Sequence, residues 1–322
     1  MSEAGAVPSP TKNFKQMKRR DFFIKSLGAG VAAGAAFSLG GYNKLWAAGP
    51  PPAAYDMVAV MGAEPDAMFD KGISALGGIT NFVRKGQTVV IKPNIGWDRS
   101  PEMAANTNPL LVKRIVEHCI RAGADKVYVF DHTCHNWVKA YKNSGIEKAA
   151  KDAGARMVPG DTEKYYHEVE IPGASILKKT KVHELIMESD VFINVPVLKH
   201  HSSTKMTAAM KNLMGNVWDR GYWHSNNLHQ CIADYATFEK KPTLNVIDCY
   251  RVMMRNGPQG VSVSDSVEMK AQIISADMLA ADTAAASMIK MSPEQIDYIP
   301  LASKKGIGRM DLENLNIHRI KM

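Results

Sequence analysis

The segment VVIKPN, residues 89–94, holds the pattern that decides the fold of this 322-residue chain. Its first three residues are apolar and β-branched, with no polar residue between them, as in a strand that helices cover on both faces. A lysine, a proline and an asparagine follow at once. A buried strand that ends on polar side chains is typical of parallel α/β sheets, in which ligands bind beyond the carboxyl ends of the strands.

Similar apolar runs predict the other strands, at residues 57–61, 127–130, 191–193, 244–247 and 271–274. Helical periodicity between them predicts helices at 109–121 and near 146–153, 205–214, 228–238 and 278–290, the last capped by Asp277. This alternation predicts an α/β fold with a mostly parallel or mixed sheet flanked by helices. The layering is Rossmann-like, but neither GxGxxG nor GxxxxGK[ST] occurs, so the sequence has no dinucleotide fingerprint and no P-loop.

The first 48 residues have the layout of an export signal. A basic stretch, residues 12–25, precedes residues 26–43, which carry no formal charge, and the small-residue site LWAA comes before three prolines. The pair Arg19-Arg20 in the basic stretch is similar to the twin-arginine signal. We therefore expect an export signal over 1–48, a linker over 49–55 and a single α/β domain over 56–322.

This signal predicts a location and a carrier. It implies the twin-arginine translocase as a partner during export, and a periplasmic or otherwise exported location. The alternative is a retained N-terminal anchor, because 18 residues at a rise of about 1.5 Å nearly cross a hydrocarbon core of about 30 Å.

Most of the net positive charge of the chain lies in the predicted signal. The formal charge is +8, but residues 1–48 hold seven basic and two acidic side chains, which leaves 33 basic and 30 acidic in the rest. The remainder is close to neutral and has no dense basic run. Nucleic acid is therefore not an expected partner.

Polar side chains follow four predicted strands at the point where each strand ends. Because the carboxyl ends of parallel strands meet at one edge of a sheet, we expect them to converge there and to form a ligand site. The alternative is that Asp131 and Asp248 cap the turns that follow them and that Lys92 and Lys199 face solvent. They are Lys92 and Asn94, then Asp131, His132, Thr133, Cys134 and His135, then Asn194, Lys199, His200 and His201, and finally Asp248.

The segment DHTCH, residues 131–135, also offers metal ligands. His132, Cys134 and His135 are the candidates, but their spacing matches no zinc or EF-hand signature. Histidines that donate and accept hydrogen bonds are the default interpretation, and a bound metal ion is the alternative. The four cysteines are scattered without a CxxC pair, so an iron–sulfur cluster held by this chain alone is not expected.

The order of several motifs resembles the family catalogued as domain of unknown function 362. These motifs are KPN at 92–94, NVP at 194–196, KNLMG at 211–215, LH at 228–229, NVID at 245–248, GPQG at 257–260, SAD at 275–277 and GIG at 306–308. The resemblance covers nearly all of the chain after the signal and implies no particular reaction. It does imply site residues, namely Lys92, Asn94, Lys199, His201, Lys211, Asn212, His229, Asp248, Asp277 and Asp282. Some relatives carry a ferredoxin-like iron–sulfur module, whose closely spaced cysteines this sequence lacks.

Two functions fit these residues. The first is an exported enzyme that acts on a small anionic molecule, with Lys92, Lys199 and Lys211 holding its carboxylate or phosphate group. His201 or His229, oriented by Asp248 or Asp282, is then the proton-transfer group. The second is a periplasmic protein that binds a ligand, metal or cofactor without turnover, and a role as partner of a redox system rests on analogy with the iron–sulfur relatives alone. The sequence makes no prediction of the oligomeric state.

Overall fold

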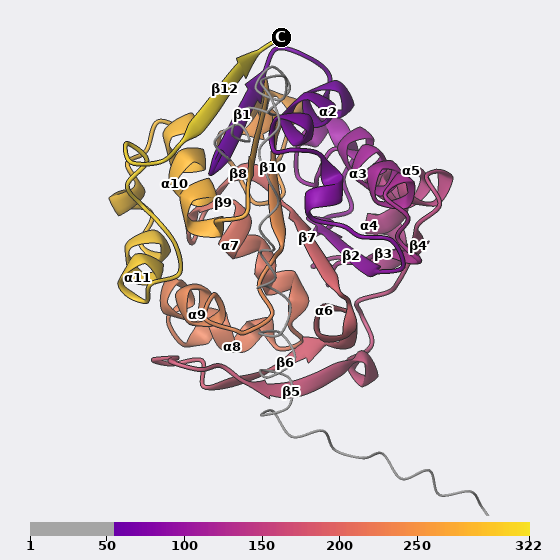
Figure 1. Ribbon diagram of the computed structural model, residues 1–322. Coiled ribbons are helices and arrows are strands. Elements are labelled where there is room, and N and C mark those ends of the chain that lie inside the picture. The colour runs from indigo at the N-terminus through magenta and orange to yellow at the C-terminus, as the bar shows by residue number, and fades with distance from the viewer. Residues whose placement is uncertain (1–54) are drawn as a thin grey trace, which may run out of the picture. The chain divides into compact units, whose positions relative to one another are not determined.

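The computed structural model describes residues 55–322, so the predicted signal over 1–48 and nearly all of the predicted linker lie outside the described residues. Residues 55–322 form a mixed, mostly parallel sheet with helices on both faces (Figure 1). The predicted fold class is therefore confirmed. Within the same range, no helix is long and apolar enough to cross a membrane.

The main sheet has ten strands. Eight lie side by side in the order β12-β1-β11-β10-β7-β2-β3-β4, while β8 pairs with β10 and β9 pairs with β8. Pairing is parallel from β10 through β7, β2 and β3 to β4, and antiparallel on both sides of β11. The strands are β1 Met57–Met61, β2 Thr88–Pro93, β3 Lys126–Val129, β4 Arg156–Met157, β7 Val191–Val195, β8 Val197–His201, β9 Lys205–Thr207, β10 Leu244–Met253, β11 Ser266–Ser275 and β12 Ile317–Lys321.

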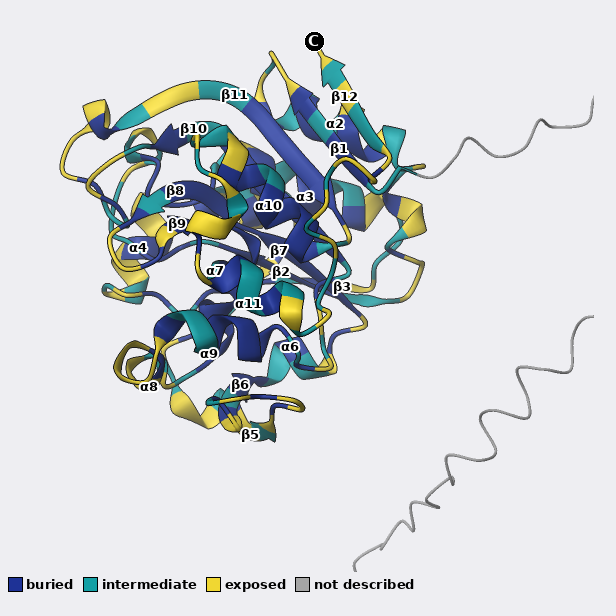
Figure 2. Cartoon of the chain, turned by 90° about the vertical axis from the view of Figure 1, so that its left-hand side faces the viewer, coloured by how far each residue is buried: buried dark blue, intermediate teal, exposed yellow. Residues whose placement is uncertain are grey.

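Helices cover the two faces of this sheet and bury its central strands, which are dark blue in Figure 2. One face packs against α2 Pro65–Ala75, α3 Pro109–Arg121, α4 Trp137–Asn143 and α5 Ile146–Asp152. The other face packs against α7 Ala209–Asn212, α9 Leu228–Tyr235, α10 Met278–Met288 and α11 Tyr298–Lys304. Because both faces are covered, apolar runs occupy both faces of the central strands, as the run at 89–91 predicts, and their polar residues, such as Asn194 and Asn245, are buried as well.

Alternation along β2 assigns its side chains to these two helix layers. Val89 and Ile91 pack with the α3 side, whereas Val90 packs with the α7 side. Lys92 shares the parity of Val90, so its side chain enters the α7 side, where its ammonium contacts Asn212. The strand thus directs a lysine under the end of α7.

The six predicted strands are all present, and so are the helices predicted at 109–121 and near 146–153, 228–238 and 278–290. The helix predicted near 205–214 is wrong. Residues 205–207 form β9, which pairs with β8 in a hairpin, and only the four residues of α7 and a 3-10 turn over Leu213–Asn216 are helical. Backbone pairing with β8 overrides the helical pattern of the segment. A separate hairpin, formed by β5 Tyr166–Glu170 and β6 Lys179–His183, is not among the predicted elements.

The mixed pairing places the predicted site residue Asp277 away from the carboxyl edge of the parallel strands. β11 runs antiparallel to β10, so Ser275 lies opposite Asn245 near the start of β10. Asp277 follows Ser275 and caps α10, accepting hydrogen bonds from the Leu279 and Ala280 amides at 2.9 Å each. Asp248 lies within β10, which continues to Met253 instead of ending at residue 247.

Candidate functional site

Four basic side chains line a cavity of about 450 Å³ at the carboxyl edge of the parallel strands. Lys92 comes from β2, Lys199 from β8, Lys211 from α7, and Arg220 from the start of α8 Arg220–Ser225. Asp131, just after β3, is the one carboxylate among the described residues that line the cavity. We call this cavity the cationic pocket, because its basic side chains outnumber its carboxylates by four to one.

Lys92 and Asp131 form a buried ion pair at the base of the pocket. The Lys92 Nζ lies 2.8 Å from Asp131 Oδ1, and the two side chains are 1% and 2% exposed. The ammonium also donates to the carbonyl of Pro93 at 2.9 Å and to Asn212 Oδ1 at 3.0 Å. Asp131 Oδ2 accepts the Ile95 amide at 2.7 Å. Burial lowers the pKa of Lys92, and the Asp131 carboxylate opposes that shift. The two charges neutralise each other within the pair.

Gly215 provides the space that this ion pair needs. A Cβ at this position would lie 1.9 Å from Asp131 Oδ1 and 2.6 Å from Lys92 Nζ. Both atoms belong to a buried pair that has no room to withdraw. The glycine of the KNLMG motif therefore lets the turn after α7 pass directly over the ends of β2 and β3.

Lys199 is also buried but has no ionic partner among the described residues. Its Nζ donates to Asn94 Oδ1 at 2.9 Å and to the carbonyl of Ala105, and no carboxylate within residues 55–322 pairs with it. Burial, with smaller contributions from the Lys211 and Lys92 ammonium groups, lowers the pKa of Lys199 to about 7. The site thus holds an amine that is poised between its charged and neutral forms at neutral pH.

Lys211 lies at the end of α7 and is half-buried. Its Nζ lies 3.1 Å from the Met214 Sδ, a weak acceptor, and across the described chain no carboxylate pairs with it. Burial lowers its pKa to about 8, and the neighbouring Arg220 and Lys92 cations contribute to the shift. Of the three lysines, it is the one whose ammonium has the greatest unused hydrogen-bonding capacity.

Arg220 forms the wall of the pocket nearest the loop after β3. Its guanidinium donates to the carbonyls of His132 and Thr133 at 2.7 Å each, and to Cys134 Sγ at 3.4 Å. No side-chain carboxylate in residues 55–322 pairs with it. Arg220 thus holds the loop through neutral acceptors. Its positive charge is not neutralised there and adds to that of the lysines.

His201 lines the same pocket in its neutral form. Burial lowers its pKa to about 2, and the Lys211 and Lys199 cations contribute. Its Nδ1 accepts a hydrogen bond from the Ser203 amide at 3.1 Å. By this hydrogen-bonding pattern we assign the proton of the neutral ring to Nε2, which makes His201 a donor.

Four asparagines connect the strand ends beneath the pocket. Asn94 Nδ2 donates to Asn212 Oδ1 at 3.0 Å, Asn212 Nδ2 donates to Asn194 Oδ1 at 2.9 Å, and Asn194 Nδ2 donates to Asn245 Oδ1 at 3.0 Å. This chain of amides spans β10, β7, β2 and α7. It orients the oxygens that hold Lys92 and Lys199, so a buried amide network supports the lysines.

Six of the ten predicted catalytic and ligand-binding residues line the cationic pocket. They are Lys92, Asn94, Lys199, His201, Lys211 and Asn212. The structure does not bring the other four, His229, Asp248, Asp277 and Asp282, to this cavity. Each of these four has a separate partner elsewhere in the fold.

Two of these four residues, Asp248 and His229, make their contacts outside the cationic pocket. Asp248 accepts the amides of Asn108 at 2.7 Å and Tyr250 at 3.0 Å, and its side chain has the parity of Val246, on the α3 side. Burial raises its pKa to about 6. His229 lies on α9 with its Nε2 3.6 Å from Asp297 Oδ2.

Asp282 is buried, and no cationic side chain within residues 55–322 pairs with its carboxylate. It accepts the backbone amides of Ala209 and of Met210, the latter at 3.1 Å, and so caps α7. Burial raises its pKa to about 7. Its effect on the pocket is therefore indirect, because α7 carries Lys211 and Asn212.

The three candidate metal ligands make separate contacts. The His132 Nδ1 lies 2.8 Å from the carbonyl of Val217, and its ring stacks on Trp218. Cys134 is exposed, and the His135 Nδ1 accepts the Asp98 amide at 3.2 Å. Within residues 55–322, no group of three or more His, Cys, Asp or Glu side chains is arranged to hold a metal ion.

Two residues of the pocket had little or no sequence signal. Arg220 follows no strand and lies in no recognised motif, so only the fold brings it to the loop after β3. Thr207 lies on β9, in the segment predicted as helix, and it is 3% exposed. Its Oγ1 has no hydrogen-bond partner within the described chain.

Comparison with known proteins identifies the family. The family described as Domain of unknown function (DUF362) matches residues 89–287, more than half of the chain. A thylakoid-associated protein of Synechocystis sp. is 24% identical over 245 residues, which cover 73% of each chain.

Two solved structures show a low similarity to this chain. The lactate racemase apoprotein of Thermoanaerobacterium thermosaccharolyticum superposes with a TM-score of 0.47 at 12% identity, over 77% of this chain and 59% of that one. A protein of Thermotoga maritima gives a TM-score of 0.44 at 11% identity, over 74% of this chain and 59% of that one. The chain thus spans less than two thirds of either protein.

Proposed function

The chain belongs to the family of unknown function DUF362, and we propose that it binds a small carboxylate or phosphate anion in the cationic pocket. One observation carries this proposal. Lys199, Lys211 and Arg220 line one cavity without an ionic partner in residues 55–322, while the only lining carboxylate, Asp131, is already paired with Lys92. An anion in the pocket would supply the missing negative charge.

The remaining donors of the pocket support the same ligand class. His201 presents its Nε2–H, Thr207 has an unused hydroxyl, and Lys211 has unused ammonium hydrogens. Carboxylate and phosphate oxygens are acceptors that match such donors. A volume of about 450 Å³ is within the range of small-molecule sites.

Replacement of Lys211 by Gln tests the proposal. We expect the affinity of the purified protein for acetate or inorganic phosphate, measured by isothermal titration calorimetry, to fall about 10- to 100-fold, because a charge-assisted hydrogen bond contributes about 1.5–3 kcal/mol. Lys211→Arg should retain most of the affinity, and Lys241→Gln, at an exposed lysine outside the pocket, should retain all of it. Equal affinities of the wild type and Lys211→Gln for both anions would contradict the proposal.

A second candidate function is acid–base catalysis on the bound anion. It is favoured by the amines of Lys199 and Lys211, whose pKa values of about 7 and about 8 allow both protonation states near neutral pH. To distinguish it from binding without turnover, the molecule that co-purifies with the protein can be returned to it in D₂O and followed by mass spectrometry. Catalysis predicts deuterium at a carbon position or a changed mass, and an unchanged ligand would identify a binding protein.

Export by the twin-arginine route is part of the proposal. It is supported by the Arg19-Arg20 pair and the uncharged stretch after it, and it agrees with the thylakoid association of the Synechocystis relative. The double variant Arg19→Lys, Arg20→Lys keeps the charge, and we expect cell fractionation to find it in the cytoplasm while the wild type is exported. Export of the variant at the wild-type level would rule out this route, and wild-type protein in the membrane fraction would indicate a retained anchor.

A further inference from the structure

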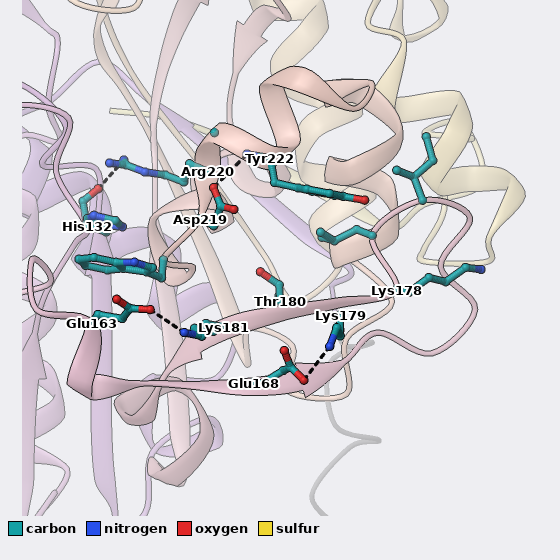
Figure 3. Close-up of a pocket in the computed structure, with 14 residues that line it drawn as sticks. His132, Glu163, Glu168, Lys178, Lys179, Thr180, Lys181, Asp219, Arg220 and Tyr222 are labelled. Atoms are coloured by element: carbon teal, nitrogen blue, oxygen red, sulfur yellow. Dashed lines mark hydrogen bonds and ion pairs between the residues drawn. The ribbon is translucent and has the colours of Figure 1, made fainter.

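A second cavity, of about 940 Å³, adjoins the cationic pocket. The two share His132, Arg220 and Gly221 in their linings, so the second begins where the first ends. Its walls are the β5–β6 hairpin on one side and residues 218–222 on the other (Figure 3). We call this cavity the hairpin cleft.

The hairpin wall of the cleft is fixed to the rest of the fold. The Trp218 amide donates to the carbonyl of Lys181 at 3.0 Å, and Val182 forms a β-bridge with Val217. Tyr166 on β5 also lies against Trp218, with ring centroids 5.3 Å apart. The cleft is therefore a built part of the structure rather than a gap beside a free loop.

The charges of the hairpin cleft are largely balanced, unlike those of the cationic pocket. Glu163 pairs with Lys181, and Glu168 pairs with Lys179 at 3.0 Å, as the dashed lines in Figure 3 show. Asp219 accepts the Tyr222 amide at 3.0 Å. A group bound in the cleft therefore need not carry the negative charge that the cationic pocket requires of its ligand.

The cleft presents aromatic and apolar surface between these pairs. The rings of Trp218 and His132 stack with centroids 5.0 Å apart at an angle of 5°. Tyr222 is 41% exposed, and its ring lies across the cleft from the strand that carries Thr180 in Figure 3. Flat side chains of this kind bind planar groups by stacking.

We infer that the natural ligand has two parts, an anionic group in the cationic pocket and an uncharged planar group in the hairpin cleft. The inference rests on the proposed function and extends it, because it assigns the ligand to the class of aryl or heteroaryl carboxylates and phosphates. Arg220 stands at the junction of the two cavities, where the anionic group and the planar group of such a ligand would meet.

The test compares inorganic phosphate with 2-naphthyl phosphate on the purified full-length protein by calorimetry. We expect the wild type to bind the naphthyl ester at least about tenfold more tightly than phosphate, because an aromatic contact and burial of the ring are added. Tyr222→Ala should lose about 3- to 10-fold of this advantage, whereas Tyr222→Phe, which keeps the ring, should retain it. Tyr222 does not line the cationic pocket, so phosphate affinity should be the same in both variants.

The outcomes separate this inference from the proposed function. If the wild type binds phosphate but gains nothing from the naphthyl group, the two-part ligand is refuted and anion binding stands. If it binds neither probe nor acetate, anion binding fails and the inference fails with it. Should Tyr222→Ala not fold, as its lost phosphate binding would reveal, the wild-type comparison of the two probes still decides.

Discussion

The buried ion pair between Lys92 and Asp131 is the interaction on which the site depends. Removing two charges from water costs several kcal/mol per ion, and the structure offsets this with a 2.8 Å contact, with neutral oxygens that accept hydrogen bonds from Lys92, and with the Ile95 amide that donates to Asp131. The pair joins the ends of β2 and β3. Because Gly215 passes over it, it also determines where the turn after α7 lies, and therefore where Lys211 enters the pocket.

Lys199 and Lys211 show what the same burial does without a carboxylate. Amide and carbonyl oxygens orient Lys199, but they cannot neutralise it, so burial lowers its pKa to about 7. Burying an unpaired lysine costs free energy, and such lysines are found in binding sites because a ligand that restores the charge balance then binds more tightly. Asp282 supports the pocket indirectly, because its carboxylate caps the short helix that carries Lys211 and Asn212.

The sequence predicted the part of the site that depends on strands alone. Apolar runs followed by polar residues located Lys92, Asn94 and Lys199, because parallel strands bring their carboxyl ends to one edge. It could not show that β11 is antiparallel, which places Asp277 at the other end of the sheet, or that Asp248 lies within a longer β10 with its side chain on the α3 side. The sequence did not predict Arg220, because its position depends on a long-range contact with the loop after β3 that no local pattern encodes.

The most direct test of the account is the pH dependence of acetate binding by calorimetry in buffers of different ionisation enthalpy. Acetate keeps its charge between about pH 6.5 and 9.5. An anion raises the pKa values of Lys199 and Lys211 above their values of about 7 and about 8 in the free protein. Affinity should thus be complete well below pH 7 and fall as the pH rises from about 7 through 8 and above, with net proton uptake over the whole range in which it falls. An affinity that stays constant over this range, with no protons exchanged, would contradict a pocket built from uncompensated lysines.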